Sequence, residues 1–181
     1  MIAKQWGKPE VLAAFLKDPK ARNMTPNQRL GWTHSRYVTR KGSIDDHLIF
    51  LRIFTKALSK AGVPLLTGTD SPSIPGMYPG YSEHEDLRTL VEAGLANYEA
   101  LSAATRVPGE FIHKFVPEAP TFGTLKVGMR GDTVLVNRNP LESLEKLRSP
   151  KGVLADGRWF SAADLSTLLE QHRKVFDSLL Q

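Results

Sequence analysis

The chain has 181 residues, of which 41% are hydrophobic and 24% are charged, as in an ordinary soluble globular protein. The formal charge is +5, but the basic residues are spread thinly along the sequence. Their densest group, Arg36, Arg40 and Lys41, is too short for a nucleic-acid patch. The absence of cysteine excludes disulfides and thiolate zinc sites.

Two features of the sequence bear on its location. No apolar run approaches the ~18 residues of a membrane span. The N-terminal residues lack the apolar stretch and cleavage site of a signal peptide. We therefore expect a cytoplasmic protein with neither a membrane nor a nucleic acid as its partner, unless the true start lies upstream of Met1.

The first half of the chain contains one clear helix followed by an apolar run. A short helix is predicted over 9–17, and 18–42 reads as a long surface excursion that folds over another part of the chain. Ser43 and Asp46 have capping-box spacing and begin a helix that ends at Ala61-Gly62. The apolar run 63–67 then predicts a buried strand, which is half of an α/β repeat.

Loop and helix signals follow that predicted strand. The segment 71–81 is rich in Pro and Gly and predicts a loop. Ser82 and Glu85 repeat the capping-box spacing before a helix that ends at Gly94. Further helices are predicted from Asn97 and near Pro108.

The C-terminal part of the chain predicts short strands and a last helix. Strands are expected at 123–125 and 132–136, and a hairpin is expected around Asp156-Gly157. Ser161 and Asp164 are spaced to cap the final helix. One buried strand cannot form a sheet, so 63–67 requires parallel neighbours that the sequence does not offer.

Asp70 is the strongest candidate for a catalytic residue. It follows the carboxyl end of the predicted strand, where α/β barrels place their catalytic groups. The alternative is that Asp70 only stabilises its turn. A serine nucleophile at Ser71 is a rival interpretation, but the sequence contains no Gly-x-Ser-x-Gly motif.

The order and spacing of several motifs give a more specific indication. They are GTD at Asp70, the HEDL helix, the EALSAAT helix and the later string GTLKVGMRGDTVLV. Together they resemble the C-terminal portion of amidohydrolases related to imidazolonepropionase, over roughly residues 43–160. The resemblance implies an α/β fold: the last strand and following helices of a (β/α)₈ barrel, then C-terminal strands of a small composite β-sandwich. The expected divisions are a partial barrel at 1–121, a β-sandwich segment at 122–160 and a helix at 161–181.

The same resemblance implies a chemistry. Family members use divalent metal, most often zinc, to hydrolyse carbon–nitrogen bonds other than ordinary peptide bonds, in amide or cyclic amide substrates. The aspartate that matches Asp70 binds metal and acts as the base. His84, in the HEDL helix, is a weaker candidate for substrate contact, as are Tyr78 and Tyr81 in the preceding loop. Their alternative roles are local hydrogen bonding and packing of the loop itself.

The sequence departs from the family in its histidines. The family's first strand carries His-x-His, and later strands add further ligands, but no such motif occurs here. A catalytic zinc site normally has three protein ligands, so we do not expect this chain to bind the metal tightly by itself.

Two functional hypotheses therefore remain open. The first is a truncated or split amidohydrolase that needs an N-terminal half-barrel from another chain. The second is a non-catalytic remnant that binds a small molecule or partner, or self-associates, through an open barrel edge. A reading frame upstream of Met1 that encodes His-x-His would instead identify a fragment of a conventional enzyme.

Overall fold

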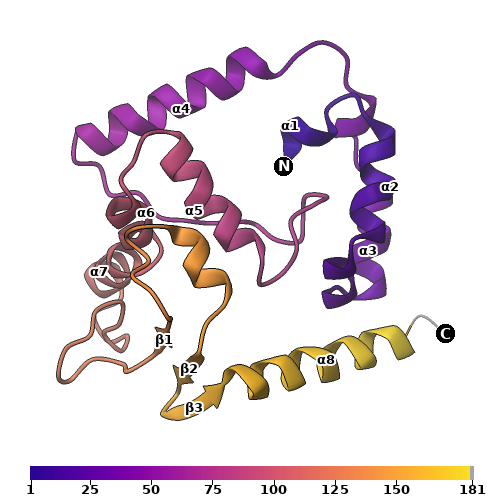
Figure 1. The fold of residues 1–181 in the computed structure, drawn as a ribbon. Coiled ribbons are helices and arrows are strands. Elements are labelled where there is room, and N and C mark those ends of the chain that lie inside the picture. The colour runs from indigo at the N-terminus through magenta and orange to yellow at the C-terminus, as the bar shows by residue number, and fades with distance from the viewer. Residues whose placement is uncertain (180–181) are drawn as a thin grey trace. The chain divides into compact units, whose positions relative to one another are not determined.

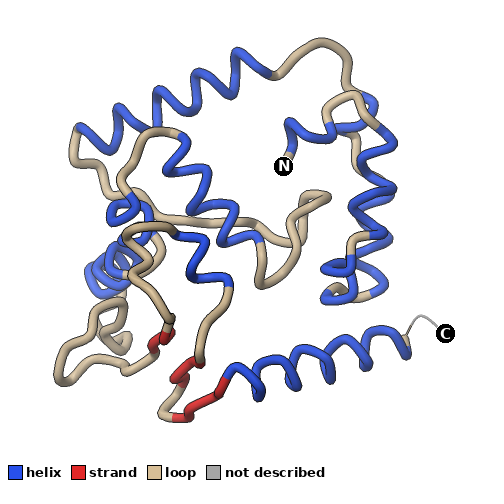
Figure 2. The backbone as a smooth tube through the Cα atoms, viewed as in Figure 1, coloured by secondary structure: helices blue, strands red, loops and turns tan. Residues whose placement is uncertain are grey.

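The computed structural model describes residues 1–179 and is mostly helical, with one small sheet (Figures 1 and 2). The helices and 3₁₀ turns before the sheet are α1 (Ile2–Gln5), α2 (Pro9–Lys17), η1 (Pro19–Asn23), α3 (Pro26–Thr33), η2 (Tyr37–Thr39), α4 (Asp45–Lys60), α5 (Ser82–Glu92), α6 (Asn97–Ala103) and α7 (Arg106–Phe115). They are followed by β1 (Thr133–Leu135), η3 (Leu144–Arg148), β2 (Gly152–Ala155), β3 (Arg158–Ser161) and α8 (Ala162–Ser178). No helix within residues 1–179 is both long and apolar enough to cross a membrane.

The chain forms two compact units that each contain separate stretches of sequence. The first unit combines Met1–Leu51, Thr69–Glu83 and the described part of Thr167–Gln181. The second combines Arg52–Gly68 and His84–Ser166. Asp70 therefore lies in the first unit, and His84 lies in the second.

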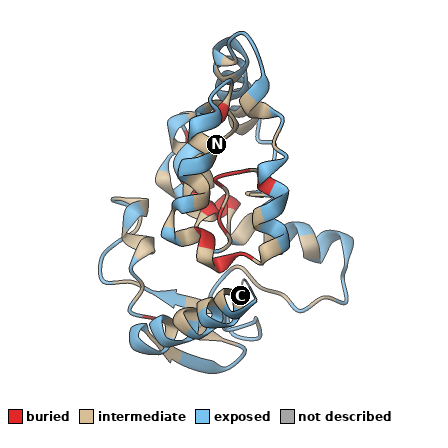
Figure 3. Cartoon of the chain, turned by 90° about the vertical axis from the view of Figure 1, so that its right-hand side faces the viewer, coloured by how far each residue is buried: buried red, intermediate tan, exposed pale blue. Residues whose placement is uncertain are grey.

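The first unit has a core built largely by the N-terminal excursion. Ala21, Met24, Trp32 and Tyr78 are buried together, with Leu12, Phe15, Leu16 and Tyr81 packed against them. Figure 3 colours the ribbon by burial and shows that the buried stretches are short and that most of the chain is intermediate or exposed. Local caps shape this excursion. The Asp18 carboxylate accepts from the Lys20 amide at 2.8 Å and begins η1. Thr25 and Gln28 form a capping box at the start of α3. The segment predicted to fold over another part of the chain thus supplies most of a core.

The second unit contains the sheet, whose strands are antiparallel in the order β1-β2-β3. Ala155 pairs with Arg158 across a two-residue turn, Asp156-Gly157, with φ of 49° and 71°. Two successive positive φ angles are the geometry that Asp-Gly turns favour in hairpins. This confirms the predicted hairpin. The predicted cap of the last helix is also confirmed, because the Ser161 and Asp164 side chains each accept from the other's backbone amide.

The predicted buried strand at 63–67 is wrong. The segment is extended but pairs with no strand, and Val63 and Leu66 are 43% and 42% exposed. Its ends are tied to helices instead, since the Val63 amide donates to the Leu58 carbonyl and the Thr67 amide to the Ala103 carbonyl, each at 3.1 Å. The segment 63–67 forms no strand because backbone hydrogen bonds of a sheet need a neighbouring strand, and residues 1–179 provide no parallel partner.

Other local predictions also need correction. Residues 123–125 are not a strand. Ser43 accepts from the Asp45 amide rather than forming a box with Asp46. Ser82 donates to the Tyr78 carbonyl at 3.1 Å, while Glu85 is engaged by arginines, so their predicted capping box does not form. The α/β class is confirmed, but its sheet is the small antiparallel one.

Helix α4 exposes most of its apolar side chains. It has no buried residue. Five of its large apolar residues are between 42% and 66% exposed: Ile49, Phe50, Leu51, Ile53 and Phe54. An apolar surface of this kind is typical of a site of association.

Candidate functional site

Asp70 ends the extended segment and begins the loop 71–81. Its backbone has φ 51°, a left-handed conformation that Asp tolerates better than most residues. Its carbonyl accepts from the Ser73 amide at 2.9 Å and also from the Ser73 hydroxyl. The residue is exposed, and its carboxylate makes no hydrogen bond or ion pair with another residue in the 1–179 range. The carboxylate is therefore available to bind a ligand or accept a proton.

The loop after Asp70 is held by hydrogen bonds to its own backbone. The Ser71 amide donates to Thr69 Oγ1 at 3.2 Å, and the Ser71 hydroxyl donates to the Met77 carbonyl at 2.7 Å. These bonds close the loop on itself because Pro and Gly prevent a helix or strand here. Asp70 is thus attached to an ordered turn rather than to a sheet.

The structure places the two candidate tyrosines in the first unit. Tyr78 is 5% exposed, and its hydroxyl donates to the Phe15 carbonyl at 2.9 Å. Burial raises the pKa of Tyr78, and the nearby Asp18 carboxylate raises it further. The Tyr81 hydroxyl accepts from Arg173 at 3.2 Å. Tyr78 thus packs in the core of the first unit, against the N-terminal helices rather than only within its own loop. A role in substrate contact stays a prediction for both tyrosines.

His84 lies in the first turn of α5 and is partly buried. The neighbouring residue Glu85 accepts from Arg88 at 2.7 Å and from Arg148 at 3.0 Å. Asp86 accepts from the Gly68 amide at 2.9 Å. The HEDL motif therefore uses its acidic residues for structural bonds in the second unit. A role of His84 in substrate contact stays a prediction.

The ion pairs of Glu85 lead to a testable pH dependence. Burial alone would raise the pKa of Glu85, but hydrogen bonds and charge from Arg88 and Arg148 outweigh it, so the pKa lies below its usual value. A depressed folded-state pKa stabilises the fold above the unfolded-state value of about 4.3, and this contribution is lost as pH falls through the folded-state pKa. We expect Arg148→Gln to raise the pKa of Glu85 in a carboxyl ¹³C NMR titration and to reduce the loss of stability on acidification.

A matched variant controls this measurement. Arg106→Gln breaks a comparable pair with Glu110 on α7 and should leave the Glu85 titration unchanged. An unchanged midpoint in Arg148→Gln would show that Arg148 does not set the pKa of Glu85.

The residues present do not make a complete metal site. Within residues 1–179, no three His, Asp or Glu side chains gather as a possible ligand set. Asp70 offers one carboxylate, whereas a catalytic zinc ion normally takes three protein ligands.

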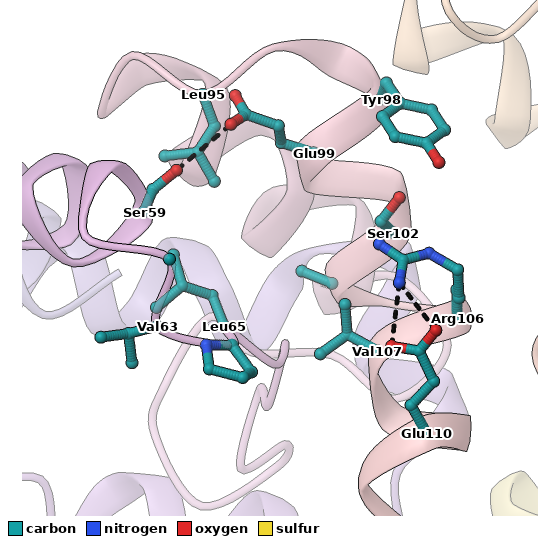
Figure 4. Close-up of a pocket in the computed structure, with 13 residues that line it drawn as sticks. Ser59, Val63, Leu65, Leu95, Tyr98, Glu99, Ser102, Arg106, Val107 and Glu110 are labelled. Carbon is teal, nitrogen blue, oxygen red and sulfur yellow. Dashed lines mark hydrogen bonds and ion pairs between the residues drawn. The ribbon is translucent and has the colours of Figure 1, made fainter.

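The second unit contains an open cavity that the sequence analysis did not identify (Figure 4). Its volume is about 290 Å³. Arg106 Nη1 donates to both Glu110 carboxylate oxygens at 2.7 and 2.8 Å, and the Ser59 hydroxyl donates to Glu99 at 3.2 Å. The apolar part of its wall includes Val63, Leu65, Leu95 and Val107. The four-residue spacing of Arg106 and Glu110 was visible in the sequence, but the cavity depends on contacts between distant segments.

No known family profile matches the chain. The chain is 34% identical over 121 residues to ochratoxinase of Aspergillus niger, a match that covers 65% of this chain and 23% of ochratoxinase. Ochratoxinase of the Aspergillus niger strain ATCC 1015 gives the same values. A solved structure described as bottromycin amidohydrolase superposes with a TM-score of 0.68 at 25% identity, covering 89% of this chain and 36% of that one. The match thus spans about a quarter of the length of the curated relatives.

Proposed function

We propose, on the premise that the chain belongs to the amidohydrolase superfamily, that it supplies one part of an active site that hydrolyses a carbon–nitrogen bond other than an ordinary peptide bond. The observation that carries the proposal is the exposed Asp70 carboxylate, which no described side chain engages, at the end of the extended segment 63–69. The substrate class is a small amide or cyclic amide.

In this proposal Asp70 is both a metal ligand and a base. A carboxylate with no internal partner can accept a proton from the attacking water and deliver it to the leaving nitrogen. A divalent ion, with zinc as the first choice, would activate that water when bound. The remaining ligands are assigned to residues outside this sequence, because Asp70 cannot form the site alone.

The proposed partner is an N-terminal half-barrel, supplied by another chain or by a longer form of the same protein. Two observations support it. The segment 63–67 is extended without a strand partner, and α4 exposes apolar side chains such as Phe50 and Ile53. Parallel strands from the partner would pair with 63–67, and a covering layer of protein would bury the apolar side chains of α4. The segment 63–67 would then become the last barrel strand, and β1–β3 would join a composite β-sandwich.

A second candidate function is a non-catalytic binding module. The observation that favours it is the cavity between α6, α7 and residues 62–65, which combines apolar walls with the charged pair Arg106–Glu110. Such a mixture is typical of small-molecule sites. Self-association through α4 belongs to the same alternative.

A chimera tests the proposed function. The segment of bottromycin amidohydrolase that superposes on this chain is replaced by this chain, and hydrolysis of the parent enzyme's substrate is measured with added Zn²⁺. We expect detectable, metal-dependent hydrolysis because Asp70 would complete the site. The parent enzyme with the same segment deleted is the control. A chimera that folds and binds zinc like the parent but does not hydrolyse would contradict the proposal.

A further inference from the structure

The loop that follows Asp70 is also held by side chains from the N-terminal helices. Trp32 Nε1 donates to the Pro72 carbonyl at 2.6 Å, across 40 residues of sequence. Gln5 Nε2 donates to the Pro75 carbonyl at 3.2 Å, across 70 residues. All four residues belong to the first unit. Proline has no amide hydrogen, so the backbones of Pro72 and Pro75 can form hydrogen bonds only through their carbonyl groups.

Both donors are buried, which makes these bonds costly to lose. Trp32 is 2% exposed and Gln5 is 0% exposed. The Gln5 side-chain oxygen accepts from the Ser35 hydroxyl at 3.1 Å, which fixes the direction of its amide group. The Trp32 ring also packs edge-on against Tyr78, at 5.3 Å between centroids. A carbonyl left without its partner here would be an unsatisfied polar group beside a packed core.

The loop connects these donors to Asp70. The Asp70 carbonyl accepts from the Ser73 amide at 2.9 Å, so Asp70 and the bonded Pro72 carbonyl are parts of one tight turn. Asp70 itself has positive φ, a conformation that the hydrogen bonds of this turn help to hold. We therefore expect a shift of Pro72 to change the direction of the Asp70 side chain.

We propose that Trp32 and Gln5 are positioning residues that set the conformation of the loop after Asp70 and thereby aim the Asp70 carboxylate. The effect of this positioning on catalysis rests on the proposed function, whereas the positioning of the Asp70 carboxylate does not. Segment 18–42, which the sequence presents as a surface excursion, thus carries a residue that orders the candidate site. Such support from a rigid neighbouring layer is what precise active-site geometry requires.

The test removes one donor without changing the shape of the side chain. Trp32 is replaced by β-(3-benzothienyl)alanine, which has sulfur in place of the indole N–H. The same replacement at Trp6, whose Nε1 donates to the Gly42 carbonyl at 3.2 Å, is the matched control. The readouts are hydrogen exchange of the Ser73 amide and the ¹³C signal of the Asp70 carboxylate across pH.

We expect the replacement at Trp32 to speed Ser73 exchange about fivefold and to move the Asp70 carboxylate signal, because one partly buried hydrogen bond is lost. The replacement at Trp6 should change neither. Gln5→Met removes the second donor at similar side-chain volume and should likewise speed Ser73 exchange and move the Asp70 signal. It replaces the Trp32 variant in the test if that variant does not fold. Unchanged Ser73 and Asp70 signals in a folded variant, or equal changes from the Trp6 replacement, would overturn the proposal.

These readouts need no metal or substrate, so they separate the two proposals. If the Trp32 replacement moves Asp70 but Asp70→Asn leaves hydrolysis by the chimera unchanged, the positioning stands and the proposed function fails. If Asp70→Asn abolishes hydrolysis but the Trp32 replacement leaves Asp70 unmoved, the proposed function stands and the positioning fails.

Discussion

Replacing Asp70 with Asn is expected to reduce kcat/KM for hydrolysis by the chimera about 10²- to 10⁴-fold, the usual contribution of a positioned general base. Asn keeps the size of the side chain and tolerates the left-handed backbone of this position, φ 51°. It removes the negative charge and the proton-accepting oxygen. The fold should therefore survive while the chemistry is lost, and both are measured on the same preparation by circular dichroism and steady-state kinetics.

Asp156 provides a matched control for this variant. It is also an exposed aspartate with positive φ, 49°, but it lies in the hairpin turn between β2 and β3. Asp156→Asn makes the same chemical change at a position that also has a positive φ angle. We expect it to leave kcat/KM unchanged. Equal activities of the two variants would remove Asp70 from the proposed mechanism.

Gly109→Ala is expected to lower the free energy of unfolding by about 1–3 kcal/mol, the range for overpacking in a close-packed site. Gly109 is buried in α7, and a Cβ atom there would lie 2.1 Å from the Phe122 carbonyl oxygen. Because the obstacle is backbone, it cannot rotate away as a side chain could. Residues 122–123 or α7 would have to move, and urea denaturation would record the loss.

Gly31→Ala is the opposite case and controls for helix propensity. Gly31 lies within α3, and a Cβ atom there would meet nothing within 4 Å. Alanine in an open helical position should stabilise the fold by up to about 1 kcal/mol. The two glycine replacements should thus shift the denaturation midpoint in opposite directions. A stabilising Gly109→Ala would mean that Phe122 does not approach α7 as closely as described.

The parts of the fold that the sequence predicted are those set by local chemistry. Helix α4 ends where Ala61-Gly62 indicated, the Asp156-Gly157 turn forms its hairpin, and Ser161 with Asp164 caps α8. Each signal lies within a few residues of the structure that it specifies. Propensity and capping need no knowledge of the rest of the chain.

The parts that were not predicted depend on distant partners. Apolar content at 63–67 indicated a strand, but strand pairing requires a neighbour that no local pattern reveals. The bonds from Trp32 and Gln5 to the loop 71–81 join residues 40 and 70 positions apart. Asp70 was predicted as a candidate from its place after that run and from family resemblance, whereas the hydrogen bonds that hold its loop could be seen only in three dimensions.

The turn at Asp156-Gly157 has a consequence for the order of folding. The β2–β3 hairpin closes over two residues, whereas β1 joins through Leu135 and Gly152, which are much farther apart in sequence. Short closures cost less conformational entropy and form on a timescale of about 1–10 μs. We therefore expect the hairpin to form as a nucleus onto which β1 adds later, so that the last strand pair in the sequence is the first to assemble.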